Sequence, residues 1–378
     1  TRLASLRTMM YFAKHANLLQ NRENISRYHF GNDMYIRIVR FLVKNKNADE
    51  ELWETLIEEF LPFHDVQLYT LRNLKRILDV VKKKRTTSSS SEETNQVLNN
   101  VFRLLLEIRV PTKQNRLDNF FVEFSTEEQL VEKIQGKKRK RDNTTTTTNS
   151  AHKLSSYRRA VETCWLTLLR IENLPEAMYK RALLLLPKHV IPYMEHPVLL
   201  CDFLTDSCNA GGVTSLLALE GLFILMQRHS LEYPQFYEKL YVMLTPSVFL
   251  VTYRERIYRL MHLCLLSSHL PAYLVAAFLK RLGRLSLTAP PTGALYVIPL
   301  IYNMLKRHPQ CEPLIQRGRV GAVMSSSSSS SSSSSKESDP YLFHEANPKN
   351  SHALESSLWE LRALQNHYCP AVASLAAA

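Results

Sequence analysis

Pro-marked turns separate amphipathic helical segments at a nearly constant interval through the last third of the chain. Five helices are expected to begin 21, 19, 18 and 21 residues apart, at Val213, Pro234, Tyr253, Pro271 and Thr292. A two-helix unit therefore recurs every 37 to 40 residues, close to the period of HEAT-like and armadillo-like arrays. Each unit has one hydrophobic face that it cannot bury alone, and stacking against a neighbour buries it. The spacing predicts an all-α fold of the irregular HEAT/armadillo-like α-solenoid type, with a compact helical bundle as the alternative.

Composition supports the all-α prediction and indicates more than one structural region. The chain has 378 residues, 45% of them hydrophobic, but only 9 glycines, too few for a β protein rich in glycine turns. We expect an N-terminal helical region over 1–135, a basic, threonine-rich disordered linker over 136–153, and a C-terminal helical domain over 154–378. A disordered serine-rich insert interrupts this domain at about 325–338. Such low-complexity loops cannot bury enough apolar surface to offset the entropy of ordering them.

Two dense basic tracts carry most of the net charge of +13. The first comprises Lys82, Lys83, Lys84 and Arg85, and the second comprises Lys137, Lys138, Arg139, Lys140 and Arg141. Both are expected to be flexible, and the rest of the chain is only mildly basic. Short Lys/Arg clusters of this kind are typical of nuclear-import signals or nucleic-acid contacts. A solubilising loop is the alternative.

Motifs that carry enzymatic chemistry are missing from the sequence. We find no phosphate-binding loop, nucleophile elbow, zinc-protease helix or dinucleotide-binding glycine pattern. His189, His196, Cys201 and Cys208 could each ligate zinc, but their spacing is wider than the close pairs of structural zinc sites. We therefore expect a protein that is not an enzyme and uses no cofactor, no metal and no small-molecule substrate.

The sequence also indicates a reducing, non-membrane setting. Its six cysteines form no CxxC pair, and no secretory signal peptide is recognisable. Leu285–Leu305 lacks charged residues, but Pro290, Pro291 and Gly293 divide it into a turn and a buried helix, so we expect no membrane span. Because the sequence begins without Met, we expect it to be part of a longer protein.

Two groups of residues are candidates for binding. Trp359 lies in the segment SSLWELRALQ together with Arg362, and it is interpreted either as a core residue or as an anchor for a partner protein. Arg254, Arg256 and Arg259 alternate with aromatic residues and are a possible RNA face. Alternatively, these arginines lie on the solvent-exposed face of an ordinary amphipathic helix.

Four stretches resemble a known family. They are the helical segments Ala218–Phe249 and Phe278–Pro309, the tripeptide Asp339-Pro340-Tyr341, and the segment SHALESSLWEL over 351–361. Together they resemble the CCAAT-binding-factor-type (CBF) domain of nucleolar complex proteins, most strongly over 213–370. The serine run before Asp339 looks like an insertion relative to that family, whose members also continue with further helical sequence.

The resemblance implies a non-enzymatic scaffold of nucleolar ribosome biogenesis. Such a protein assembles or matures the precursor of the small ribosomal subunit in the pre-rRNA processing particle, in the nucleus and nucleolus. The implied partners are a stably bound nucleolar protein 14-like protein, other small-subunit assembly factors, and pre-rRNA, contacted directly or by proximity. Two of these stretches, Asp339-Pro340-Tyr341 and the segment over 351–361, are called the two family motifs below. We expect partner contacts in them or directly after them, at Tyr341, Trp359, Glu360 and Arg362.

Two other functions remain open. One is a direct nucleic-acid-binding nuclear protein of the RNA-binding or transcription type, which would show steeply salt-dependent binding to naked nucleic acid. The other is a transport solenoid, for which more regular repeats would be expected.

Overall fold

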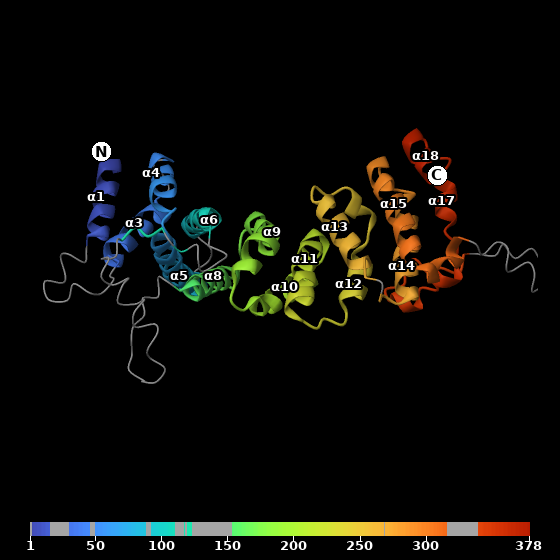
Figure 1. Cartoon of the computed structure of the whole chain (residues 1–378), viewed down its shortest axis with the longest axis horizontal. Helices are drawn as coiled ribbons and strands as arrows, with labels where there is room; N and C mark the ends of the chain where they lie inside the picture. The colour runs from blue at the N-terminus through green and yellow to red at the C-terminus, as the bar shows by residue number, and fades with distance from the viewer. Residues whose placement is uncertain are drawn as a thin grey trace, which may run out of the picture. The chain divides into compact units, whose positions relative to one another are not determined.

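The structure is a computed structural model (Figure 1), and it describes most but not all of the chain. The described residues are 2–15, 30–45, 50–87, 92–109, 117, 119–122, 153–267, 269–315 and 339–378. Within them every regular element is a helix, which confirms the predicted all-α fold. The solenoid arrangement stays a prediction.

The described helices group into two compact units, Thr1–Phe203 and Leu204–Ala378. The predicted linker over 136–153 lies outside the described residues except for Lys153, and the predicted domain limits stay a prediction. Leu154–Leu169, expected in the C-terminal domain, groups with the first unit. The serine-rich insert before Asp339 also lies outside the described residues.

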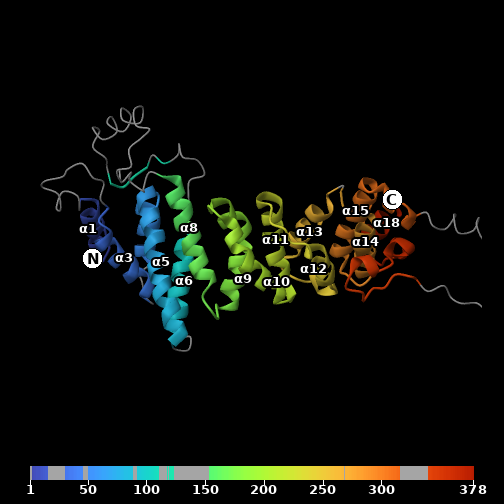
Figure 2. The same ribbon diagram turned by 90° about the horizontal axis from the view of Figure 1, so that it is seen from below.

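The first unit is organised around one long helix. Its helices are α1 (Arg2–Lys14), α3 (Asn32–Lys44), α4 (Glu50–Thr55), α5 (His64–Thr87), α6 (Glu92–Glu107), α8 (Leu154–Leu169) and α9 (Glu176–Leu185). A π-helical turn, Leu56–Phe60, follows α4, and another, Leu186–Val190, follows α9. The 24-residue α5 packs against α3, α6 and α8, which lie beside it in Figure 2.

The second unit includes the five helices that the sequence spacing predicted, α11 to α15. Its described helices are α10 (Cys201–Asn209, beginning at the unit boundary), α11 (Gly212–His229), α12 (Phe236–Met243), α13 (Arg254–Leu265), α14 (Ala272–Ser286), α15 (Pro291–Arg307), α17 (Trp359–Leu364) and α18 (Pro370–Ala377). The five starts expected between Val213 and Thr292 each lie within two residues of an observed start, so these predictions are confirmed. In the part of the chain that the structure describes, no helix combines the length and apolar character that a membrane span requires.

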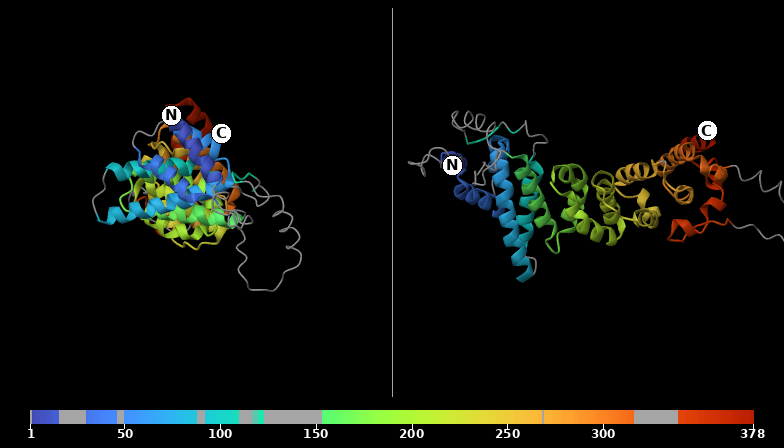
Figure 3. Two further views of the ribbon diagram at one scale, coloured as in Figure 1. Left: turned by 90° about the vertical axis from the view of Figure 1, so that its left-hand side faces the viewer. Right: turned by 60° about the horizontal axis from the view of Figure 1, so that its bottom comes forward.

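Helix α14 is the most deeply buried element of the second unit. Twelve of its 15 residues are buried, because α15, α17 and the short 3-10 turns Pro348–Asn350 and Ala353–Glu355 all pack on it. In Figure 3 the red segments after residue 339 lie beside the orange helices α14 and α15. Segments that follow the serine-rich insert in the sequence therefore cover α14, which precedes the insert.

Candidate partner surface

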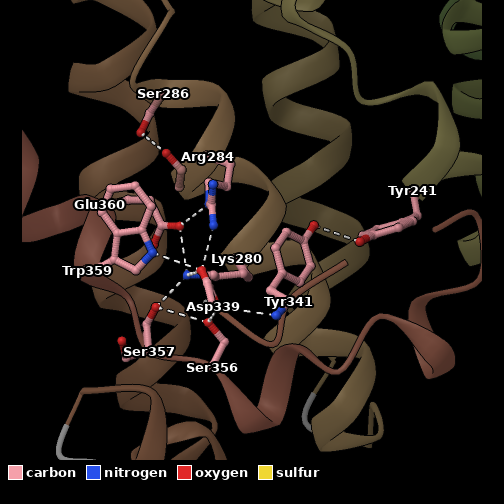
Figure 4. A network of polar contacts seen from close by, with 11 residues as sticks. Tyr241, Lys280, Arg284, Ser286, Asp339, Tyr341, Ser356, Ser357, Trp359 and Glu360 are labelled. Atoms are coloured by element: carbon pink, nitrogen blue, oxygen red, sulfur yellow. Dashed lines mark hydrogen bonds and ion pairs between the residues drawn. The ribbon is translucent and has the colours of Figure 1, made fainter. Parts of the chain in front are cut away.

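Three cations on α14 hold the segments that carry the two family motifs. Lys280, Arg281 and Arg284 lie in an otherwise apolar helix, and Lys280 is 0% exposed. A buried cation is costly unless carboxylates or carbonyls surround it. The segments beginning at Asp339 and Ser356 supply those acceptors (Figure 4).

Asp339 accepts five hydrogen bonds with its two carboxylate oxygens. Oδ2 accepts from Lys280 Nζ at 2.9 Å and from Arg284 Nη2 at 2.6 Å. The same oxygen accepts from the indole Nε1 of Trp359 at 2.9 Å. Oδ1 accepts from the Ser356 hydroxyl and from the backbone N–H of Tyr341 at 3.2 Å. One carboxylate thus joins α14, α17 and both family motifs.

Glu360 completes the network from the first turn of α17. Its side chain is fully buried, and Oε1 accepts from Lys280 Nζ at 2.7 Å and from Arg284 Nε at 2.6 Å. Lys280 also donates to the carbonyl of Ser357 at 2.5 Å. We call Lys280, Arg284, Asp339, Trp359 and Glu360 the Asp339 clasp.

The electrostatics of the clasp favour its charged form. Burial alone would raise the pKa of Asp339, but hydrogen bonds from Ser356, Lys280, Trp359 and Arg284 outweigh burial and hold this pKa well below its usual range. Burial alone would lower the pKa of Arg284, but Asp339 and Glu360 raise it. Asp339 and Arg284 therefore both stay ionised, each favouring the charged form of the other.

The third cation, Arg281, fixes the segment after Asp339. It donates to the carbonyls of Leu244 and Phe343 at 3.0 Å each, and its guanidinium lies 4.5 Å from the ring centre of Tyr241. The hydroxyl groups of Tyr241 and Tyr341 are 2.8 Å apart in a buried hydrogen bond. Burial raises the pKa of Tyr341, so this phenol stays neutral.

Trp359 lies at the surface of the clasp with a fixed orientation. Its side chain is 41% exposed, so its interpretation as a core residue is wrong. The hydrogen bond to Asp339 holds one edge of the indole, and Arg284 lies 4.6 Å from the ring centre. Cation–π contact of this kind stabilises the ring without covering all of it. The exposed part of the indole is thus held in one orientation.

The other predicted partner-binding residues divide into exposed and buried ones. Arg362 is exposed one turn after Trp359. Tyr341 and Glu360 are only 5% and 0% exposed, so they lie beneath the surface, where they support Trp359 and cannot touch a partner in this conformation. Sequence reasoning missed Lys280, Arg281 and Arg284. The signal available was a group of three cations in a helix whose other residues are nearly all apolar.

The structure describes one of the two predicted basic tracts, and that tract is helical. Lys82, Lys83, Lys84 and Arg85 lie in the last turns of α5, so the prediction that this tract is flexible is wrong. Arg85 donates to the carbonyls of Glu172 and Asn173 at 3.1 and 2.8 Å. Lysine and arginine are good helix formers, so the tract extends α5 beyond its last buried residue, Val81. The second tract, Lys137–Arg141, lies outside the described residues.

The predicted RNA face on α13 is only partly available. Arg254 and Arg259 are exposed, whereas Arg256 is half-buried and forms an ion pair with Glu220 at 3.8 Å. In the described residues no group of three or more His, Cys, Asp or Glu side chains is placed to hold a metal ion.

A separate hollow in the second unit has a volume of about 590 Å³. It lies between the start of α11, the helix α12 and the loop at Asn347, and its apolar walls include Leu216, Val242 and Val248. Val242 is 47% exposed. This hollow is large enough to accept apolar side chains of an extended segment.

Comparison with known proteins supports the resemblance noted in the sequence. Residues 215–376 match the model of the CBF/Mak21 family. The chain is 40% identical over 335 residues to the nucleolar complex protein 4 homolog of Gallus gallus, covering 88% of this chain and 58% of that protein. It is 39% identical over 349 residues to the homolog of Homo sapiens, covering 92% and 60%. It is 40% identical over 285 residues to the protein NUCLEOLAR COMPLEX ASSOCIATED 4 of Arabidopsis thaliana, covering 73% and 49%.

These relatives are named as nucleolar complex proteins, and none of the three names denotes an enzyme. The predicted nucleolar localisation is confirmed by this similarity. The chain spans about three fifths of the length of the vertebrate relatives it matches.

Proposed function

We propose that this chain, whose residues 215–376 form a CBF/Mak21 family domain, is a non-enzymatic scaffold in nucleolar ribosome biogenesis. The proposal includes an α-solenoid arrangement of the helices and a role in assembling the small-subunit precursor within the pre-rRNA processing particle. It also includes a stable partner of the nucleolar protein 14 type. The family match and the nucleolar relatives support the general role.

The observation that carries the proposal is the exposed, fixed indole of Trp359. Partner proteins gain most of their binding energy from a few aromatic and arginine residues. An anchor that is already oriented loses little rotamer freedom on binding. Trp359 meets both conditions because Asp339 and Arg284 hold it in place while 41% of it stays exposed. Arg362 adds an exposed cation on the same helix.

In the proposed mechanism, an extended segment of the partner lies against α17 and covers Trp359. The Asp339 clasp keeps α17 attached to α14 so that this surface has one shape. The hollow beside α12 provides a second contact for apolar side chains of the same or another assembly factor. Two contacts on one rigid unit would strengthen binding by raising the effective concentration at the second site.

The test is affinity purification of the tagged chain from nuclear extract after RNase treatment, followed by mass spectrometry. We expect a nucleolar protein 14-like partner to be recovered, and Trp359→Ala to reduce its recovery at least tenfold, since hot-spot residues contribute about 2 kcal/mol or more. Tyr302→Ala is the matched control, because Tyr302 is a 55% exposed aromatic residue on α15 of the same unit. Equal recovery with both variants would refute the role of Trp359, and absence of any assembly factor would refute the scaffold.

Direct nucleic-acid binding is the second candidate function, and the exposed Arg254 and Arg259 favour it. If it were the main function, RNase treatment would remove the recovered assembly factors whether or not Trp359 is present. The same purification therefore separates the two candidates.

A further inference from the structure

One exposed face of α3 combines cations with an aromatic ring in a pattern that no part of the proposed scaffold uses. The exposed residues of this helix are Asp33, Met34, Arg37, Arg40, Phe41 and Lys44. Arg37, Arg40 and Lys44 follow one another at helical spacing, and Phe41 lies next to them. We call Arg37, Arg40, Phe41 and Lys44 the basic stripe. These four residues and Asn45 border a shallow hollow.

The cations of the stripe form no ion pair with a carboxylate in the part of the chain that the structure describes. This holds for Arg37, Arg40 and Lys44 alike. Other arginines of the same unit are engaged: Arg7 pairs with Glu59, and Arg103 pairs with Glu50. Three cations lie within two helical turns, about 10 Å along the axis, and pair with no described carboxylate, so they create a local positive potential that favours an anionic ligand.

Phe41 distinguishes this face from an ordinary solvated one. Its ring is 52% exposed, although α3 buries its apolar residues Ile38, Val39, Leu42 and Val43 against the unit. Proteins that bind single-stranded nucleic acid combine exposed aromatic rings with cations in this way. A base stacks on the aromatic side chain, while the cations contact phosphates on either side.

The stripe is presented by a rigid helix. The hydroxyl groups of Tyr35 and Thr70 are 2.6 Å apart, which ties α3 to α5. The side chain of Asn73 donates to Asn32 at 2.8 Å, and that of Asn100 donates to the carbonyl of Val43 at 3.0 Å. Figure 1 shows α3 beside α1, and the two helices pack together. The inner face of α3 is thus fixed at both ends, and Arg37, Arg40, Phe41 and Lys44 are exposed on the outer face.

We propose that the basic stripe of α3 binds single-stranded RNA, with Phe41 stacking on one base and Arg37, Arg40 and Lys44 contacting phosphates. Charge complementarity selects an anionic ligand, and the exposed ring selects a nucleic acid over an acidic protein surface. The choice of RNA rests on the nucleolar function proposed above. The binding itself requires no partner protein, so it can be measured separately from the scaffold role.

The experiment measures fluorescence anisotropy of a fluorescein-labelled U12 RNA with the purified chain at several salt concentrations. The first variant is the triple Arg37→Gln, Arg40→Gln, Lys44→Gln, which keeps good helix formers. Its control is the triple Arg76→Gln, Arg170→Gln, Lys188→Gln, which removes three exposed cations from the same unit and lowers the net charge equally. The second variant is Phe41→Ala.

We expect the stripe triple to weaken U12 binding at least tenfold more than the control triple. It should also reduce the slope of log affinity against log salt by about 2, because each phosphate contact on a single strand contributes about 0.7. Phe41→Ala should weaken binding at least fivefold and leave the slope unchanged, since a stacked base carries no counterion release. Melting curves of all variants should match that of the unmodified chain, because every changed side chain is exposed.

Three results would overturn the proposal. The first is no measurable binding of U12 by the unmodified chain at low salt. The second is an equal loss of U12 affinity in the stripe and control triples, which would indicate nonspecific electrostatic attraction between the chain and the RNA. The third is unchanged affinity in Phe41→Ala together with displacement of the RNA by an equimolar oligo-glutamate peptide, which would indicate an acidic protein ligand. None of these outcomes bears on recovery of assembly factors through Trp359.

Discussion

Replacing Asp339 by Asn tests whether one carboxylate organises the candidate partner surface. The substitution keeps the shape of the side chain but removes the charge that balances Lys280 and Arg284. Lys280 is 0% exposed, and removing one partner of a buried ion pair costs about 3–5 kcal/mol. Asp339 keeps 17% exposure and Glu360 still accepts from both cations. We therefore expect the lower end, a loss of about 3 kcal/mol in the free energy of unfolding of the second unit.

The pH dependence of this loss has a definite sign. The pKa of Asp339 in the folded chain is lowered, so its contribution to stability is complete above the unfolded pKa of about 3.9. That contribution decreases as the pH falls from there toward the folded pKa. The difference between the unmodified chain and Asp339→Asn should be constant between pH 5 and 8 and should narrow only below about pH 4.

Urea denaturation followed by circular dichroism gives the stability difference, and hydrogen exchange of peptides from α14 and α17 shows whether it arises in the clasp. Asp206→Asn is the control, because Asp206 is an exposed carboxylate of the same unit and should change stability by less than about 0.5 kcal/mol. If Asp339→Asn matched this control in urea and left exchange in α17 unchanged, Asp339 would not organise the surface. A difference that grew below pH 4 would contradict the direction of the pKa shift.

Two further predictions concern packing and backbone hydrogen bonds. Gly293→Ala should destabilise the second unit by about 1–3 kcal/mol, because a Cβ there would lie 2.7 Å from Phe249 Cδ1. Gly283→Ala should be neutral or slightly stabilising, since its Cβ would meet Glu360 at an ordinary 3.5 Å; equal thermal melting of the two variants would contradict this contrast. In the first unit, Asp65→Ala should cost about 2–3 kcal/mol, because the buried Asp65 carboxylate accepts from the backbone N–H groups of Val66, Phe121 and Val122 at 2.9, 2.9 and 3.0 Å. In Asp65→Ala, the backbone amides of Phe121 and Val122 should also exchange hydrogen faster. Unchanged exchange at these amides would show that Asp65 does not hold this segment.

The helices were predictable because their signal is local. Hydrophobic periodicity and the Pro residues before α14 and at the start of α15 define each element from its own sequence. The same reasoning failed for Lys82–Arg85, where composition indicated a flexible tract. Lysine and arginine are good helix formers, so a basic tract that directly follows an amphipathic helix can extend it. Composition alone does not separate these cases.

The candidate site was less predictable because its residues meet only through tertiary packing. Asp339 lies 55 residues after Arg284 in the sequence and 20 before Trp359, yet one carboxylate contacts both. The motif around Trp359 identified the surface but not its supports, and it made Tyr341 and Glu360 look equivalent to Trp359 and Arg362. A pattern of residue types does not say which side chains are buried.

The charge pattern of α14, considered together with its burial, indicates which residues support the surface around Trp359. Twelve of the 15 residues of this helix are buried, so the charged groups of Lys280 and Arg281 are costly unless other segments bring hydrogen-bond acceptors to them. Leu244 supplies one of those acceptors, and the others described above come from residues 339–360, which follow the serine-rich insert in the sequence. The Asp-Pro-Tyr and Ser-Leu-Trp-Glu-Leu segments each supply one carboxylate to the same pair of cations, Lys280 and Arg284. Asp339 and Arg284 also contact the indole of Trp359, so the ion pairs that attach both segments to α14 are the contacts that orient this exposed ring.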